Sequence, residues 1–141
     1  TSADEKFDPL YGTPHRHWGY MDYFYTGTGS PAGGLKNPYF KLKYTGKALS
    51  AGADLHFFSV HQDMKKATGE LINKNLGNEI DFLLNYNMNR FTNIELGYSI
   101  MNATASMAFA KGQAATDADA DRYKKTGTWF YAMIRFMPAI K

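Results

Sequence analysis

The sequence contains no cysteine. Its absence excludes disulfide frameworks, thiolate metal sites and cysteine nucleophiles. The sequence also lacks any apolar run near the roughly 18 residues that a membrane-spanning helix needs. It has no Lys/Arg-rich run, no Gly-rich phosphate cradle and no dinucleotide fingerprint. With 16 Lys and Arg against 13 Asp and Glu, the small net charge indicates no particular partner, and we expect no nucleic-acid partner.

Aromatic residues are what the sequence has in excess. They make up 16% of the chain, with ten Tyr and ten Phe. Such a composition suits a β-protein in which many rings are half buried. A length of 141 residues is enough for one domain and short for two.

Alternation of apolar and polar residues predicts the strands. Clear period-two patterns cover residues 38–45, residues 48–60, both halves of residues 78–100, and residues 127–137. A weaker candidate covers residues 17–25, and a short helical turn is expected within residues 64–72. The pattern predicts an all-β fold with antiparallel neighbours.

The connections between these segments alternate in length. Residues 46–47 and 89–92 are short turns, whereas residues 61–77 and 102–126 are long polar loops. Transmembrane β-barrels combine short turns at one end with long loops at the other, and their strands need about 9–11 residues to cross a bilayer at a tilt. We therefore expect an antiparallel up-and-down transmembrane β-barrel in a bacterial outer membrane, or the C-terminal strands of a larger one. Its strands would occupy residues 38–141, after an aromatic and basic loop or an extra strand in residues 1–37.

Facing follows from the same alternation. One face of the hairpin at residues 78–100 is apolar and would contact outer-membrane lipid, with Tyr86 at the membrane interface. Aromatic residues near strand ends would join an interfacial girdle. The lipid-facing residues would be Ile80, Phe82, Leu84, Ile94, Leu96 and Ile100, and the girdle would include Tyr39, Tyr86, Phe91 and Trp129. The alternative is a soluble antiparallel sheet with one wet face.

Several segments resemble a known family. FDPLYGTPHRHWGYMDYFY at residues 7–25, GL at 34–35, ADLHFF at 53–58 and LGNEID at 76–81 are similar, in order, to the last third of alginate-export-like outer-membrane β-barrels of Bacteroidetes type. The resemblance implies a large barrel with a charged lumen through which an anionic polysaccharide passes. Five or six strands cannot close a barrel, which needs about eight. The expected partners therefore include missing N-terminal strands or further copies in a homo-oligomer.

Charged side chains on the polar strand faces are the candidate solute-binding residues. Cations in a lumen attract a polyanion and concentrate it in the pore. The alternative is that the charges pair across strands and only fill a polar interior. The candidates are Lys41, Lys43, Asp54, His56, Glu79, Asp81, Glu95 and Arg135.

The N-terminal region offers candidates for sugar contact. Aromatic rings provide faces for sugars, and basic side chains donate hydrogen bonds to carboxylates. The residues are His15, Arg16, Trp18, Tyr20 and Tyr23. The alternatives are a surface loop at the mouth of the barrel or a metal pair formed by His15 and His17. We expect neither a metal nor a cofactor.

Two apparent motifs fail on inspection. The run at residues 117–121 begins like a calcium loop, but Arg122 and Thr128 stand where that loop needs Gly and Glu. Ser50, Asp54 and His56 share one strand face, yet same-face neighbours lie about 6.6–6.8 Å apart, too far for a triad. We therefore expect no enzyme.

The sequence predicts a channel for passive passage of a charged or carbohydrate-like solute. A soluble barrel or sandwich that binds a small apolar or sugar ligand is the first alternative. A structural or adhesive surface barrel is the second.

Overall fold

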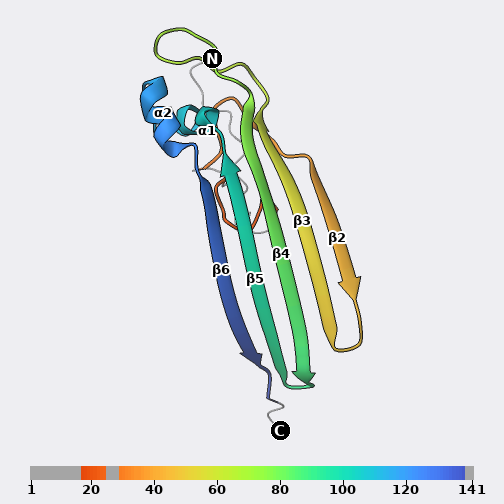
Figure 1. The fold of residues 1–141 in the computed structure, drawn as a ribbon. Coiled ribbons are helices and arrows are strands. Elements are labelled where there is room, and N and C mark those ends of the chain that lie inside the picture. Colours follow the sequence, from red (N-terminus) through yellow and green to blue (C-terminus); the bar gives the residue numbers. More distant parts are fainter. Residues whose placement is uncertain (1–16, 25–28, 139–141) are drawn as a thin grey trace.

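The computed structural model describes residues 17–24 and 29–138, which form one antiparallel sheet with two short helices (Figure 1). The sheet has the order β1-β3-β4-β5-β6, and β2 also pairs with β3. Within the described residues β2 does not pair with β6, so the sheet is not closed into a barrel. The elements are β1 (Leu35–Lys36), β2 (Tyr39–Thr45), β3 (Leu49–Val60), β4 (Asn75–Asn89), β5 (Thr92–Ala103), α1 (Ala105–Ala110), α2 (Asp117–Tyr123) and β6 (Thr126–Phe136).

The predicted all-β, antiparallel, up-and-down arrangement is confirmed. Three local predictions are wrong. Residues 17–24 form turns rather than a strand. Residues 64–72 form no helical turn, because Lys65 and Leu71 make a bridge that folds this connection back on itself. Residues 102–126 are not a plain loop, because they contain both helices.

Turn chemistry explains where the strands reverse. At the β4–β5 turn, the Phe91 N–H donates to Asn89 Oδ1 at 2.8 Å, which is the local bond that makes Asn a turn former. At the β2–β3 turn, the Gly46 N–H donates to the Leu49 carbonyl at 2.8 Å. Pro38 separates β1 from β2, because proline has no N–H to give to a strand ladder.

Strand register sorts the side chains onto two faces. We call one the apolar face and the other the polar face. Leu42, Ala53, Phe82, Tyr98 and Phe130 form one continuous row across the apolar face. Lys41, Asp54, Asp81, Ser99 and Trp129 form the corresponding row on the polar face.

The apolar face is the exposed one. Phe40 and Phe130 are each 63% exposed, whereas Glu79 is 0% and Asp81 2% exposed. A soluble sheet with one wet face shows the reverse distribution. Here the polar face turns toward the rest of the molecule.

The apolar band ends at a row of hydrogen-bonded polar side chains. Asn102 donates to Asn78 Oδ1 at 3.1 Å, and Thr126 donates to Asn102 Oδ1 at 2.9 Å. These three residues face the same way as the apolar rows. They lie at the end of the sheet that carries the long connections, so the apolar surface has a defined upper border.

The expected aromatic girdle is wrong for two of its members. Tyr39 and Trp129 lie on the polar face, because each falls in the opposite phase of its strand. The Tyr39 ring lies 5.6 Å from that of His56, and the Trp129 ring 4.9 Å from that of Tyr131. Tyr86 does belong to the apolar face, opposite Ile94.

A small hydrophobic core lies at the end with the long connections. It joins Phe24, the upper ends of β3, β4 and β5, and α1. Its centre contains Phe24, Phe58, Leu76, Met101 and Met107, each at most 5% exposed. The lower sheet, toward the short turns, has no share in this core.

Lys66 ties the two long connections together. Its ammonium group bonds to Glu70 at 2.9 Å and to Asp117 of α2 at 2.7 Å. The hydrogen bond to Asp117, followed by that to Glu70, raises the pKa of Lys66. The lysine therefore stays charged and holds α2 against the β3–β4 connection.

The absence of a side chain at Gly97 leaves room for the Tyr131 ring on the polar face. The two residues lie directly opposite each other on β5 and β6. A Cβ at Gly97 would overlap the Tyr131 ring. From this position the Tyr131 hydroxyl donates to Glu95 Oε1 at 2.6 Å.

Replacing Gly97 by Ala should therefore lower the free energy of unfolding by about 1–3 kcal/mol, as over-packing does. Gly52→Ala is the matched control, because Gly52 lies in the same row and a Cβ there meets its nearest neighbours at 3.7 and 3.9 Å. We expect the control to change stability by at most about 0.5 kcal/mol. Urea titration of both variants measures the difference. Equal effects would show that the Tyr131 ring does not depend on Gly97.

Candidate functional site

The structure places all the predicted lumen residues on the polar face. Strand pairing sets Lys41 opposite Asp54, Asp54 opposite Asp81, and His56 opposite Glu79. The remaining predicted residues, Lys43, Glu95 and Arg135, lie on the same face in other rows. The polar face is therefore a surface of mixed charge.

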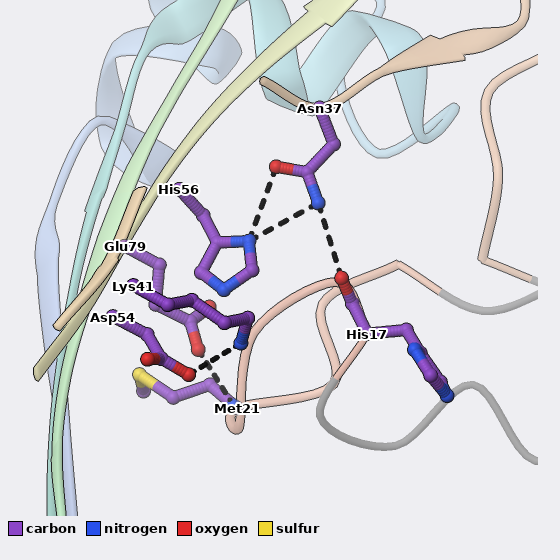
Figure 2. Close-up of polar contacts among 7 residues, drawn as sticks. All are labelled: His17, Met21, Asn37, Lys41, Asp54, His56 and Glu79. Carbon is purple, nitrogen blue, oxygen red and sulfur yellow. Dashed lines mark hydrogen bonds and ion pairs between the residues drawn. The ribbon is translucent and has the colours of Figure 1, made fainter. Parts of the chain in front are cut away.

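One predicted cation has a direct partner across strands. Lys41 forms an ion pair with Asp54 (Figure 2). This contact is of the kind that the cross-strand pairing alternative expects. Lys43 and Arg135 make no ion pair within the described part of the chain.

Hydrogen bonds hold the segment at residues 17–24 on the polar face. The Met21 N–H donates to Glu79 Oε1 at 2.8 Å, and the Asn37 amide donates to the His17 carbonyl at 3.3 Å (Figure 2). The Asn37 side chain also contacts His56 Nδ1 at 3.1 Å. Backbone of the N-terminal segment thus covers the charged row nearest the long connections.

The other end of this segment is held by α1 and the residue that follows it. Lys111 Nζ donates to the Tyr23 carbonyl and lies 5.0 Å from the centre of the Phe24 ring. Burial lowers the pKa of Lys111. The Phe24 ring in turn lies 4.6 Å from that of Phe58 on β3. The segment is therefore part of the folded structure of the polar face.

Several buried polar atoms of the polar face have no hydrogen-bond partner among the described residues. They are His56 Nε2, Glu79 Oε2, both carboxylate oxygens of Asp81, and Asn93 Oδ1. Leaving such atoms unpaired inside a protein costs about 1–3 kcal/mol each. In a water-lined cavity the penalty disappears, because ordered water supplies the missing bonds.

Below the segment the polar face is hollowed into a pocket of about 330 Å³. Its polar lining consists of Tyr20, Lys41, Lys43, Ser50, Asp54, Asp81 and Asn85. The lining combines an aromatic ring, ammonium donors and carboxylate, hydroxyl and amide groups. Such a set can hold a solute that has several hydroxyl groups and a charge.

The predicted sugar-contact residues are dispersed. His15 and Arg16 lie outside the described residues. Trp18 and Tyr23 pack against the hydrophobic core, so they are not at the pocket. Only Tyr20 lines it. Sequence reasoning missed Asn37, because it lies at the strand break before Pro38, outside the alternating pattern.

No group of three His, Asp or Glu side chains that could hold a metal ion occurs within residues 17–24 and 29–138. No helix in these ranges is long and apolar enough to cross a membrane. The comparisons with known proteins yield no matching family model, no matching curated protein and no matching solved structure.

The contact between Gly19 and Glu79 tests how the segment is seated. A Cβ at Gly19 would overlap the Glu79 carboxylate, with its carboxyl carbon only 2.6 Å away. Gly19 also has a φ of +87°. Gly69 has the same φ, but a Cβ there meets nothing within 4 Å.

We expect Gly19→Ala to destabilise the protein more than Gly69→Ala. Both variants carry the left-handed backbone penalty of about 1–2 kcal/mol. Only Gly19→Ala adds the overlap, worth about 1–3 kcal/mol more. Limited proteolysis within residues 17–24 and urea titration report the two effects. If both variants behave alike, the segment is not seated on Glu79.

Proposed function

We propose that this chain forms part of the wall of an outer-membrane β-barrel channel, through which a charged or carbohydrate-like solute passes without turnover. The observation that carries the proposal is the exposure of the apolar face of the sheet, which a soluble sheet would bury. Large apolar side chains are exposed on one face, whereas the carboxylates of Glu79, Asp81 and Glu95 are buried on the other. In a transmembrane barrel this distribution is favourable, because the apolar side chains contact lipid and the polar side chains line the interior.

The exposed apolar face argues against an isolated sheet in water. Soluble monomers rarely expose contiguous apolar patches larger than a few hundred Å². Removing one Leu or Phe side chain from water is worth about 1.5–3 kcal/mol. Five neighbouring strands carry such side chains here, with Tyr44 64% and Ile134 60% exposed. The soluble ligand-binding alternative would need this face covered by protein.

The polar face supports selection by charge. Lys43 and Arg135 offer exposed cations, while Asp54 offers a carboxylate at the pocket on the same face. Opposite charges lining one passage favour a solute that both accepts and donates hydrogen bonds, over a simple ion of either sign. The resemblance to alginate-export-like barrels stays a prediction. An adhesive barrel would share the apolar face but would not need the pocket.

A charge placed on the apolar face tests contact with lipid. Phe82→Arg puts a cation in the middle of that face, and the penalty near a bilayer midplane is about 2–4 kcal/mol. Leu83→Arg is the matched control, because Leu83 is the next residue and lines the pocket on the polar face. We expect Phe82→Arg to reduce membrane assembly strongly and Leu83→Arg to assemble, as measured by membrane fractionation.

In water the outcome would differ. Phe82 is 47% exposed, so an arginine there would cost a soluble protein little. A Phe82→Arg protein that is monodisperse without detergent, and as stable as the parent, would contradict the proposal.

The unpaired lysine in the pocket tests charge selection. Lys43→Glu reverses a charge on the polar face at the pocket wall. Lys47→Glu makes the same change in net charge at the exposed β2–β3 turn. In planar bilayers we expect Lys43→Glu to shift ion selectivity toward cations and Lys47→Glu to shift it far less. Identical ion selectivity in both variants would show that Lys43 does not line the passage.

A further inference from the structure

The two outer strands of the sheet run in the same direction. β2, β4 and β6 all run from the end with the long connections to the end with the short turns, and β3 and β5 run back (Figure 1). Within the described residues β2 pairs only with β3, and β6 only with β5. Each of these two strands therefore has one edge without a strand partner in this part of the chain.

Unpaired edges cannot persist in lipid. The bilayer core offers no water to the N–H and C=O groups of an edge, so a spanning sheet closes on itself. Joining β2 directly to β6 would make a parallel pair, whereas barrels of this kind are antiparallel throughout. An antiparallel closure between two strands of equal direction needs an odd number of strands between them.

A second copy of this chain does not meet that condition. Copies inserted in the same orientation would set β6 of one copy beside β2 of the next, and that pair is again parallel. Copies related by a two-fold axis in the membrane plane would be antiparallel, but would place long connections on both sides of the membrane. Barrels keep their long loops on one side.

We propose that the free edges of β2 and β6 are bridged by an odd number of further strands from the same polypeptide. This inference rests on the proposed function. The number is at least about three, since the smallest barrels have about eight strands and β2 to β6 supply five.

The surroundings of the two edges agree with this position. Every residue of β2 is exposed, whichever face it belongs to. On β6 the polar-face residue Trp129 is 40% exposed, while Glu79 and Asp81 on central β4 are at most 2% exposed.

Cysteine cross-linking of the protein in its native membrane tests the proposal, and the described chain contains no cysteine to interfere. Single cysteines are placed on the apolar face of β2, by Leu42→Cys or Tyr44→Cys, and on that of β6, by Phe130→Cys or Ala132→Cys. The double variant Leu84→Cys/Leu96→Cys is the positive control, because these residues are directly opposite on β4 and β5. Amide exchange of β2 and β6 is measured alongside, together with the intact mass of the denatured polypeptide.

We expect the control to oxidise within one chain and the edge variants to give no dimer. The amides of β2 and β6 should be protected as well as those of β4, and the polypeptide should be longer than 141 residues. Dimers through β2–β2 and β6–β6 would overturn the proposal in favour of inverted copies. Dimers in a variant that joins Leu42→Cys with Ala132→Cys would establish a parallel ring, and fast-exchanging edges would establish an open sheet.

Failure of this inference is distinguishable from failure of the proposed function. If the protein needs detergent but forms cross-links through its edges, the proposed membrane wall stands and the proposed bridging strands are excluded. If the protein is monodisperse without detergent, the proposed membrane wall is excluded, whatever the cross-linking result.

Discussion

The register of β4 between β3 and β5 is the constraint on which the rest of the structure depends. Successive residues of a strand point to opposite faces, so a slip by one residue would exchange the faces completely. Such a slip would move Glu79 and Asp81 to the apolar surface and Phe82 and Leu84 beneath the N-terminal segment. The pairing of His56 with Glu79 and of Tyr98 with Phe82 excludes it.

The two ends of the sheet differ in how their surfaces are packed. At the end with the long connections, a small core around Phe58 and Met101 packs in the ordinary way. Toward the short turns the strands continue with none of the described residues packed on the apolar face, and with a half-open pocket on the polar face. A sheet that extends so far beyond its own core needs a partner for each surface. In the proposed channel, lipid would contact one surface and a water-filled passage would lie along the other.

The N-terminal segment links these two regions. It meets Glu79 through Met21 and Gly19, and it places Tyr20 at the upper edge of the pocket. A solute moving along the polar face would meet this segment before it reached the long connections. Within the proposed channel the segment therefore narrows the passage from the wall, much as an inward-folded loop does in a porin.

Much of the fold could be predicted from the sequence, for a specific physical reason. Alternation over residues 78–100 fixes both the strands and their two faces, and the Asn-rich turn fixes where they reverse. The prediction failed where alternation is absent or ambiguous. Both faces of β6 carry large apolar side chains, so alternation leaves the facing of this strand open, and the expectation that Trp129 joins an interfacial girdle is wrong. The helices at Ala105–Ala110 and Asp117–Tyr123 are only 6 and 7 residues long, too short to show a helical period.

The candidate site was less predictable, because it depends on contacts between distant segments. Charges on the polar face follow from strand periodicity, which explains why Lys41 to Arg135 share a surface. Nothing in the spacing of residues 17–24 indicates that Met21 would bond to Glu79, 58 positions away. Likewise the roles of Asn37 and Gly19 come from closeness in space, which a single sequence does not carry.

The central claim is that the apolar face contacts lipid and the polar face contacts water. Spin labels placed singly at consecutive positions of β4 from Ile80 to Tyr86, in the membrane-embedded protein, test it most directly. The account predicts a period of two: oxygen, which dissolves in lipid, should collide most at the even positions, and a water-soluble nickel chelate most at the odd ones. A profile in which the even positions are reached by the nickel chelate and not by oxygen would contradict the account.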